Sequence, residues 1–233
     1  MNDGSPVNTA ILGITKMRYN RRMSKWDEIA INIELALISL IEGFALVNLA
    51  EQAVPLLNSD ALQYLPYILS GLVIILVFWS QSILHAVSFI RWPMNMGHMF
   101  LYFVAAFVQV VAYSNLTNIR MWFFWWTVFT LIGFGMYVLD LKIIRSMHGV
   151  LEKTYIDAVE RRHVYEMKVL VPFALAFNFL MLVLVSYHPN LFVSPFAYAI
   201  PALLQLAISS GALYDCVRNF RERSAMIAHR VIS

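Results

Sequence analysis

The sequence predicts an all-α fold: a polytopic membrane helical bundle with six transmembrane helices and both termini cytoplasmic. Of its 233 residues, 60% are hydrophobic and 13% are charged, which is about half the ~25% charged fraction of a typical soluble domain. Six apolar segments each have about the 20 residues that a helix needs to cross a bilayer. Lysine and arginine are concentrated in alternate connections between these segments, as the positive-inside rule predicts.

The chain divides into one bundle and two short tails. Residues 1–25 are predicted to form a cytoplasmic basic tail, residues 26–216 the bundle, and residues 217–233 a second cytoplasmic basic tail. Prolines stand at or near the ends of several segments, where helices begin or stop. The six predicted spans are, in order, about 28–54, 64–88, 94–114, 121–141, 169–188 and 195–216.

The distribution of positive charge predicts the orientation. The first tail carries five lysines and arginines, the connection between the fourth and fifth spans carries six, and the last tail carries four. With both termini inside, sixteen of the seventeen positive side chains are cytoplasmic, and Arg120 is the exception. An odd number of spans would remove this asymmetry. We therefore expect an integral membrane protein of a prokaryotic plasma membrane.

The long connection between the fourth and fifth spans is predicted to form a cytoplasmic helix over about 145–167, which can continue into the fifth span. Its run Glu160, His163 and Glu166 has the spacing ExxHxxE. The outer two residues of this run are ~120° apart on an α-helix. We therefore interpret the run as a solvated, charged helix face and not as a metal site.

Aromatic residues are clustered at the start of the fourth span, where Trp122, Phe123, Phe124, Trp125 and Trp126 follow one another. Tryptophan is enriched at membrane–water interfaces, so the cluster is predicted to anchor this span in the outer interface. A stacking site for a ring-shaped ligand is the alternative.

Acidic residues in the first span indicate a candidate functional site. Asp27, Glu34, Glu42 and Asn48 fall within an arc of roughly 120° on a helical wheel. Glu42 is expected near the membrane midplane, and Glu34 about one-third of the way in from the cytoplasm. A carboxylate in the membrane costs roughly 2.5–3.5 kcal/mol. Both side chains are therefore predicted to face the bundle interior, where they are paired, protonated or hydrated.

Polar residues of the second and third spans extend this site. Gln81 and His85 share one face of the second span, and His98 and Tyr102 share one face of the third. A short connection joins the two spans at the ends that carry the histidines, so these are expected to lie close together. Chains of carboxylates and imidazoles relay protons and hold cations in membrane proteins. The predicted ion or proton path is a polar seam of Glu34, Glu42, Gln81, His85, His98 and Tyr102.

Two other interpretations of the seam remain open. Its side chains can form interhelical hydrogen bonds that hold the bundle together, each worth about 0.6 kcal/mol on average. His85 and His98 are also weak candidates for binding haem or another metal. The sequence identifies no cofactor and no catalytic residue. It has no HExxH or GxSxG motif, no lysine in the middle of a span for a retinal Schiff base, and one cysteine, Cys216.

The predicted function is that of an ion or proton channel or carrier, and a non-enzymatic role is expected. The alternatives are a non-catalytic subunit of a larger membrane complex and a haem- or metal-dependent membrane oxidoreductase. A unit of this size is expected to work in the lipid bilayer as a homo-oligomer or within a larger complex, with a small ion as a possible ligand. The pI near 9.0 does not indicate nucleic-acid binding, because the positive charge is sorted by membrane side.

Overall fold

The structure is a computed structural model that describes residues 25–59, 61–88, 96–146, 148 and 153–232. Nearly all of these residues are helical, which confirms the predicted all-α fold. Six helices are long and apolar enough to cross a membrane, as predicted. The first basic tail lies outside the described residues, except for Lys25.

The helices follow the predicted order, but several extend beyond the predicted ends. The last one continues past Cys216 and has 38 residues, more than a bilayer requires. Two short 3-10 helices, η1 (Leu62–Tyr64) and η3 (Pro189–Phe192), lie in the connections. The α-helices are α2 (Lys25–Asn58), α3 (Leu65–Ser88), α4 (Met96–Ser114), α5 (Ile119–Ser146), α6 (Lys153–Tyr165), α7 (Val171–Tyr187) and α8 (Pro195–Ile232).

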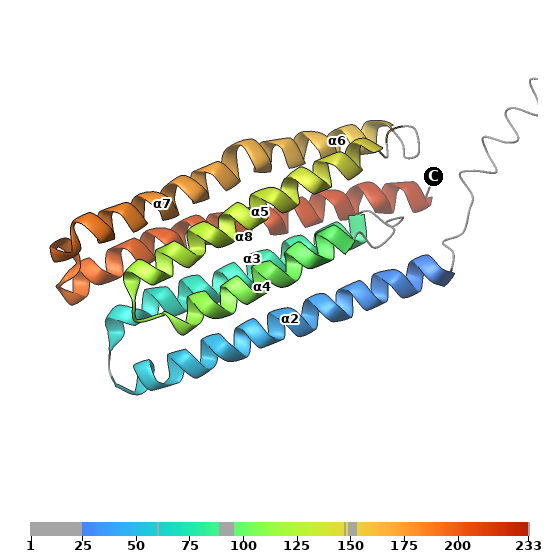
Figure 1. The fold of residues 1–233 in the computed structure, drawn as a ribbon. Helices are drawn as coiled ribbons and strands as arrows, with labels where there is room; N and C mark the ends of the chain where they lie inside the picture. The colour runs from blue at the N-terminus through green and yellow to red at the C-terminus, as the bar shows by residue number, and fades with distance from the viewer. Residues whose placement is uncertain (1–24, 60, 89–95, 147, 149–152, 233) are drawn as a thin grey trace, which may run out of the picture.

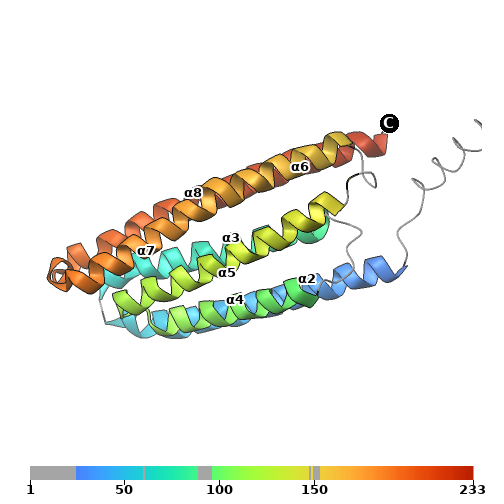
Figure 2. The same cartoon turned by 45° about the horizontal axis from the view of Figure 1, so that its top comes forward.

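The long helices run roughly along one common direction (Figure 1). In the view of Figure 2 they lie at three levels, with α7 and α8 at the first, α3 and α5 at the second, and α2 and α4 at the third. The start of α2 and the end of α8 lie at the same end of the bundle in both views. We call this the terminal end and the opposite one the loop end. That the terminal end is cytoplasmic stays a prediction.

The packing of neighbouring helices follows a simple order. Helix α3 packs against α8 and α2, α2 packs against α4, α4 against α5, and α5 against α7. The close pairs therefore run around the bundle as α8, α3, α2, α4, α5 and α7. Helices α7 and α8 stand at the two ends of this order and approach each other less closely, apart from the turn at η3. The bundle is least tightly closed between α7 and α8.

The aromatic core lies toward the loop end. Trp122, Phe123 and Trp126 are buried there together with Tyr113, and the rings of Trp122 and Trp126 meet edge to face at 5.5 Å. The prediction that the cluster anchors the span in the membrane interface is wrong for these three residues. They lie one helical turn or less apart and so occupy one face of α5, which points into the bundle. Phe124, on the other face, is exposed.

A π-helical turn, η2 (Glu166–Leu170), joins α6 to α7 without a break. The predicted solvated helix face is wrong for His163 and Glu166, each of which is 2% exposed. Helix α6 packs its His163 face against α5. At ~100° per residue Glu166 falls ~60° from His163 and ~20° from Tyr155, inside the buried face of α6. The charged run therefore turns one side toward α5, although such runs usually face solvent.

Glu160 is the member of that run that stays partly exposed. Its carboxylate accepts a hydrogen bond from Nε of Arg145 at 2.8 Å, and Nε2 of His148 lies 2.9 Å away. The bonds from Arg145 and His148 hold the pKa of Glu160 below its ordinary value. These contacts tie α6 to the end of α5, in a charged region outside the apolar part of the bundle.

Candidate functional site

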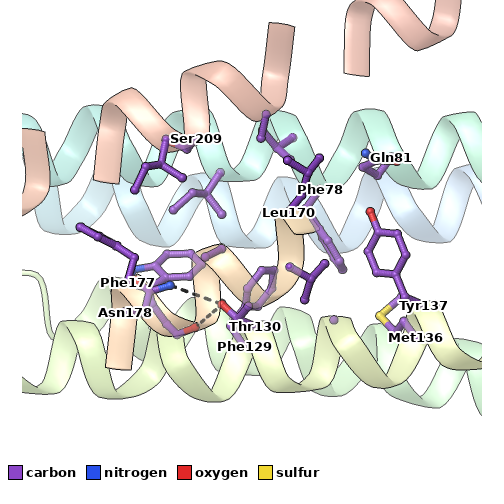
Figure 3. A pocket seen from close by; sticks show the side chains of 18 of the residues that line it. Phe78, Gln81, Phe129, Thr130, Met136, Tyr137, Leu170, Phe177, Asn178 and Ser209 are labelled. Carbon is purple, nitrogen blue, oxygen red and sulfur yellow. Dashed lines mark hydrogen bonds between the residues drawn. The ribbon is translucent and has the colours of Figure 1, made fainter. Parts of the chain in front are cut away.

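A cavity of about 220 Å³ lies between α3, α5, α7 and α8 (Figure 3). Its walls are mostly aromatic and aliphatic, and they include Phe78, Phe129 and Phe177. Its polar side chains belong to two groups, one on the side of Asn178 and one on the side of Tyr137, and both groups continue into the helices behind the cavity wall. An apolar pocket with a few placed polar groups is typical of sites that bind small molecules.

The group nearer the loop end contains no ionisable side chain, and we call it the neutral cluster. Gln205 is its centre: Nε2 donates to Oδ1 of Asn178 at 3.0 Å, and Oε1 accepts from Nε1 of Trp122 at 2.7 Å and from Oγ of Ser70 at 3.2 Å. Asn178 in turn donates to Oγ1 of Thr130 at 3.4 Å (Figure 3). The neutral cluster, Ser70, Trp122, Thr130, Asn178 and Gln205, thereby links α3, α5, α7 and α8.

The group nearer the terminal end is built from charges, and we call His98, Asp140, Arg162, Glu166 and Asp215 the ionisable cluster. Nδ1 of His98 lies 3.2 Å from Oδ1 of Asp140. His98 is 7% exposed and Asp140 is fully buried. With a proton on both ring nitrogens of His98, the pair has a net charge of zero, and after the loss of one proton its net charge is −1.

Arg162 occupies the second half of the ionisable cluster. Its Nε lies 2.8 Å from Oε1 of Glu166, and its Nη2 contacts Oδ2 of Asp215. Tyr137 donates a hydrogen bond to the other oxygen of Glu166 at 3.3 Å. The guanidinium therefore joins α6, η2 and α8, and its charge is shared between two carboxylates.

A smaller cavity of about 30 Å³ lies on the other side of His98, toward α2. Ser82 and His98 line both cavities. Tyr102 lines the smaller one, and its hydroxyl donates to Oε1 of Glu42 at 3.5 Å. A water molecule needs roughly 10–15 Å³ of such volume. Polar groups therefore continue from Asp140 through His98 and Tyr102 to Glu42, with room for water between them.

In the structure, the described residues of the predicted polar seam lie in two separate places. Glu42 and Tyr102 lie together between α2 and α4, and both are buried. Gln81 and His98 line the larger cavity, where Nε2 of Gln81 donates to the sulfur of Cys216 at 3.0 Å. Their role in a path for ions or protons stays a prediction.

Glu34 and His85 complete the predicted seam, and they belong to α2 and α3. Their side chains lie outside the described part of the structure. The predicted approach of His85 to His98 therefore stays untested. Among the described residues, no group of three histidine, cysteine, aspartate or glutamate side chains is arranged to hold a metal ion.

Sequence reasoning did not select Asp140, Arg162 or Asp215. Asp140 falls inside the predicted fourth span, two residues before Lys142, so it resembles the boundary of a span. A usable signal was nevertheless present. The short turn at 115–118 joins antiparallel helices, with His98 17 residues before it and Asp140 22 residues after it. Matching polar residues by depth across neighbouring spans, with a tolerance of about one and a half helical turns, would have placed them together.

Comparison with known proteins gives no relative. No protein-family model matches the chain, no curated protein matches it, and no solved structure matches it. The functional argument therefore rests on the two cavities and the side chains around them.

Proposed function

We propose that this integral membrane protein is a secondary carrier of a plasma membrane, which binds a small amphiphilic solute in the larger cavity and exchanges it for a proton at the His98–Asp140 pair. The observation that carries the proposal is the position of this buried pair on the wall of an otherwise apolar cavity. Ionisable side chains within membrane helices are costly, and they mark substrate pathways and proton relays.

Competition between solute and proton provides the coupling. The pair has no net charge when it holds the proton and a charge of −1 when it has released it. A solute that binds better to one of these two forms changes the affinity for the proton, and by linkage the proton changes the affinity for the solute by the same factor. A proton gradient can then drive solute movement.

Other charged and titratable groups surround the pair. Arg162 balances one of the two negative charges of Glu166 and Asp215 and holds both carboxylates in ion pairs. We therefore assign the change in the charge of the cavity to the His98–Asp140 pair. The neighbouring groups in the described part of the chain are Tyr102 on α4, Tyr137 on α5, Arg162 and His163 on α6, Glu166 on η2, and Asp215 and Cys216 on α8.

The smaller cavity supports a route for the proton. Imidazole and carboxylate groups exchange protons through intervening hydroxyls and water. Glu42, Tyr102 and His98 lie along such a line, from the predicted middle of the membrane to the larger cavity. Glu42→Gln should therefore slow proton-coupled transport while leaving solute binding in the larger cavity intact.

The shape and lining of the larger cavity support a carrier more than an open pore. Ion channels line their pathway with carbonyls, charges or water-filled space. Here the lining is mostly aliphatic and aromatic. Toward the loop end, Trp122 and Tyr113 are fully buried in the packed core. Solute release on that side requires these helices to rearrange, which is the behaviour of a carrier.

Uptake of radiolabelled solutes into proteoliposomes tests this proposal with a panel that covers each sign of charge. The proteoliposomes receive a pH step in the presence of four aromatic solutes: benzyltrimethylammonium, phenylmethanesulfonate, phenylalanine and 2-phenylethanol. At least one solute should be taken up in a way that depends on the protein and on the pH step, whether or not the exchange moves net charge. Asp140→Asn should reduce this uptake about tenfold or more, because it removes the charge change of the pair.

Asp157→Asn is the matched control, since it makes the same chemical change at a partly exposed position of α6. Its uptake should equal that of the wild type. Elution and melting profiles should be unchanged in both variants, because asparagine nearly matches aspartate in shape. The carrier proposal fails if none of the four solutes is taken up in a way that depends on the protein.

A further inference from the structure

We infer that the solute is a lipophilic organic cation of the aryl quaternary ammonium type. This inference rests on the carrier function proposed above and names its substrate class. Three features of the larger cavity carry it: the sign of the charges on its lining, the aromatic character of its walls, and its position beside the least tightly closed pair of helices.

The charge of the lining favours a cation. Among the described lining residues, Asp140 and Asp215 are the acids and His98 is the one basic side chain. No lysine or arginine is among them. Arg162 lies behind the wall and is bound to both Glu166 and Asp215, so it has little charge to offer an anion. With the proton released from His98–Asp140, the lining is negative.

The walls present aromatic rings to whatever occupies the cavity. Phe129 is central to this surface, because its ring centroid lies 5.2 Å from that of Phe78 and 5.1 Å from that of Trp126. All three side chains line the cavity. Aromatic faces attract cations through the ring quadrupole, and surfaces of this kind recognise quaternary ammonium groups.

A small inorganic cation fits this lining poorly. It would lose its hydration shell and find few oxygen atoms in exchange, because most of the wall is apolar. A quaternary ammonium ion spreads its charge over methyl groups and is weakly hydrated, so aromatic rings and one carboxylate satisfy it. The aryl group of such a solute then lies against Phe78 and Phe177, which are also on the wall.

The arrangement of α7 and α8 offers a way in from the bilayer. The cavity lies beside these two helices, which approach each other less closely than the other neighbours in the bundle. Two small side chains line the cavity between these helices, Ala174 on α7 and Ala212 on α8, and both are only partly buried. Two contacts connect this side of the bundle: the hydrogen bond between Asn178 and Gln205 and the ion pair between Arg162 and Asp215. The loosely packed region of α7 and α8 lies between these two contacts. A lipophilic cation concentrates in the membrane and can enter here.

Equilibrium dialysis against protein in lipid nanodiscs tests the substrate class. The probes are radiolabelled benzyltrimethylammonium and phenylmethanesulfonate, which share a benzyl group and differ in the sign of the charge. Empty nanodiscs of the same lipid correct for partitioning. Wild-type protein should bind the cation about tenfold or more tightly than the anion at a pH where the pair is deprotonated.

Two aromatic variants make the test specific to the cavity. Phe129→Leu removes a ring from the centre of the aromatic wall and should weaken cation binding roughly three- to tenfold. Phe196→Leu makes the same change at a side chain that is 75% exposed at the start of α8, and it should bind the cation like the wild type. Asp140→Asn should weaken binding about tenfold.

The outcomes separate the two proposals. If the anion binds as tightly as the cation, or if another member of the four-solute panel shows pH-driven uptake while the cation shows none, the substrate class is wrong, and the carrier stands as long as one solute of the panel is taken up. If neither probe binds and no solute of the panel is taken up, both proposals fall. Equal cation binding by Phe129→Leu and wild-type protein would also overturn the inference.

Discussion

The two ends of the larger cavity differ in the kind of polar group that they present. The neutral cluster around Gln205 consists of amides, hydroxyls and an indole, and its bonds join four helices at distances between 2.7 and 3.4 Å. The ionisable cluster around Asp140 and Arg162 consists of acids and bases held in pairs. Both are largely buried, so exposure does not distinguish them.

This difference gives the two clusters different roles: the neutral cluster holds the helices together, and the ionisable cluster responds to pH. Hydrogen bonds between neutral groups do not change with pH, so the neutral cluster holds α3, α5, α7 and α8 in place under all conditions. Charged pairs change their net charge when one proton is gained or lost, and such a change alters which partners and ligands are favoured. We therefore expect the neutral cluster to determine stability and the ionisable cluster to determine pH-dependent binding. The predictions below test this division, from the largest expected effect to the smallest.

Arg162→Gln should have the largest effect on stability. It leaves the carboxylates of Glu166 and Asp215 without their shared guanidinium, and breaking such a buried pair costs about 3 kcal/mol. Unfolding in mixed micelles measures the loss. Arg218→Gln is the control, since Arg218 is largely exposed and its guanidinium lies 3.7 Å from the same Asp215; it should cost less than about 0.5 kcal/mol. Equal losses would show that Arg162 has no special role.

Gln205→Leu should destabilise the bundle by about 2 kcal/mol, because the buried partners Ser70, Trp122 and Asn178 each lose a hydrogen bond. Gln109→Leu is a closely matched control. Gln109 is also a fully buried glutamine, but neither of its amide atoms is hydrogen bonded to the described residues. Its replacement should be neutral or stabilising. The role assigned to the neutral cluster is contradicted if both variants lose the same free energy.

Asp140→Asn should remove the pH dependence of cation binding. A cation that competes with one proton binds about tenfold more tightly per pH unit below the range where the His98–Asp140 pair titrates, which is ~1.4 kcal/mol, and the slope falls to zero above that range. The wild-type affinity should therefore rise with pH, and that of Asp140→Asn should stay level. Gln205→Leu should keep the slope of the wild type. A level profile in the wild type would remove the distinction between the two clusters.

Glu160 should give the smallest effect, at the surface where α5 and α6 meet. Its folded-state pKa is lowered by bonds from Arg145 and His148. The contribution to stability is therefore present above the unfolded-state pKa, near 4.5, and is lost as the pH falls through the lower folded-state value. The protection of α6 amides against hydrogen exchange, corrected for the intrinsic pH dependence of exchange, should fall more between pH 5 and 3, about these values, in the wild type than in Glu160→Gln. An identical fall in both would show that the bonds contribute nothing.

The sequence predicted the architecture because membrane insertion depends on properties that can be read along the chain. Span length, apolar content and the alternation of positive charge are local quantities, and the six helices follow from them. Burial within the bundle depends on which helix face meets which neighbour. Trp122 and Trp126 show the consequence: the same residue type serves as an interface anchor or as core, and the sequence alone favours the commoner use.

The site was predicted only in part, for related reasons. Depth in the membrane singled out Glu42, and a polar helix face beside a short connection singled out His98. Both are buried in the structure. Asp140 was missed because its position near the end of a span resembled a boundary, although it lies beside His98. Glu166 was assigned to solvent because charged runs on helices are usually solvated, although a helical wheel places it on the same face as the buried His163. The pairing of spans by depth is the information that the sequence did not make explicit.

The most direct test of the central claim is the number of protons released when benzyltrimethylammonium binds. Calorimetric titration in two buffers with different ionisation enthalpies, at a pH just below the titration range of the His98–Asp140 pair, gives this number for protein in nanodiscs. Exchange of one cation for one proton predicts a release that approaches about one proton per cation in the wild type and about zero in Asp140→Asn. Binding of the cation to wild-type protein without any proton release would contradict the proposed coupling.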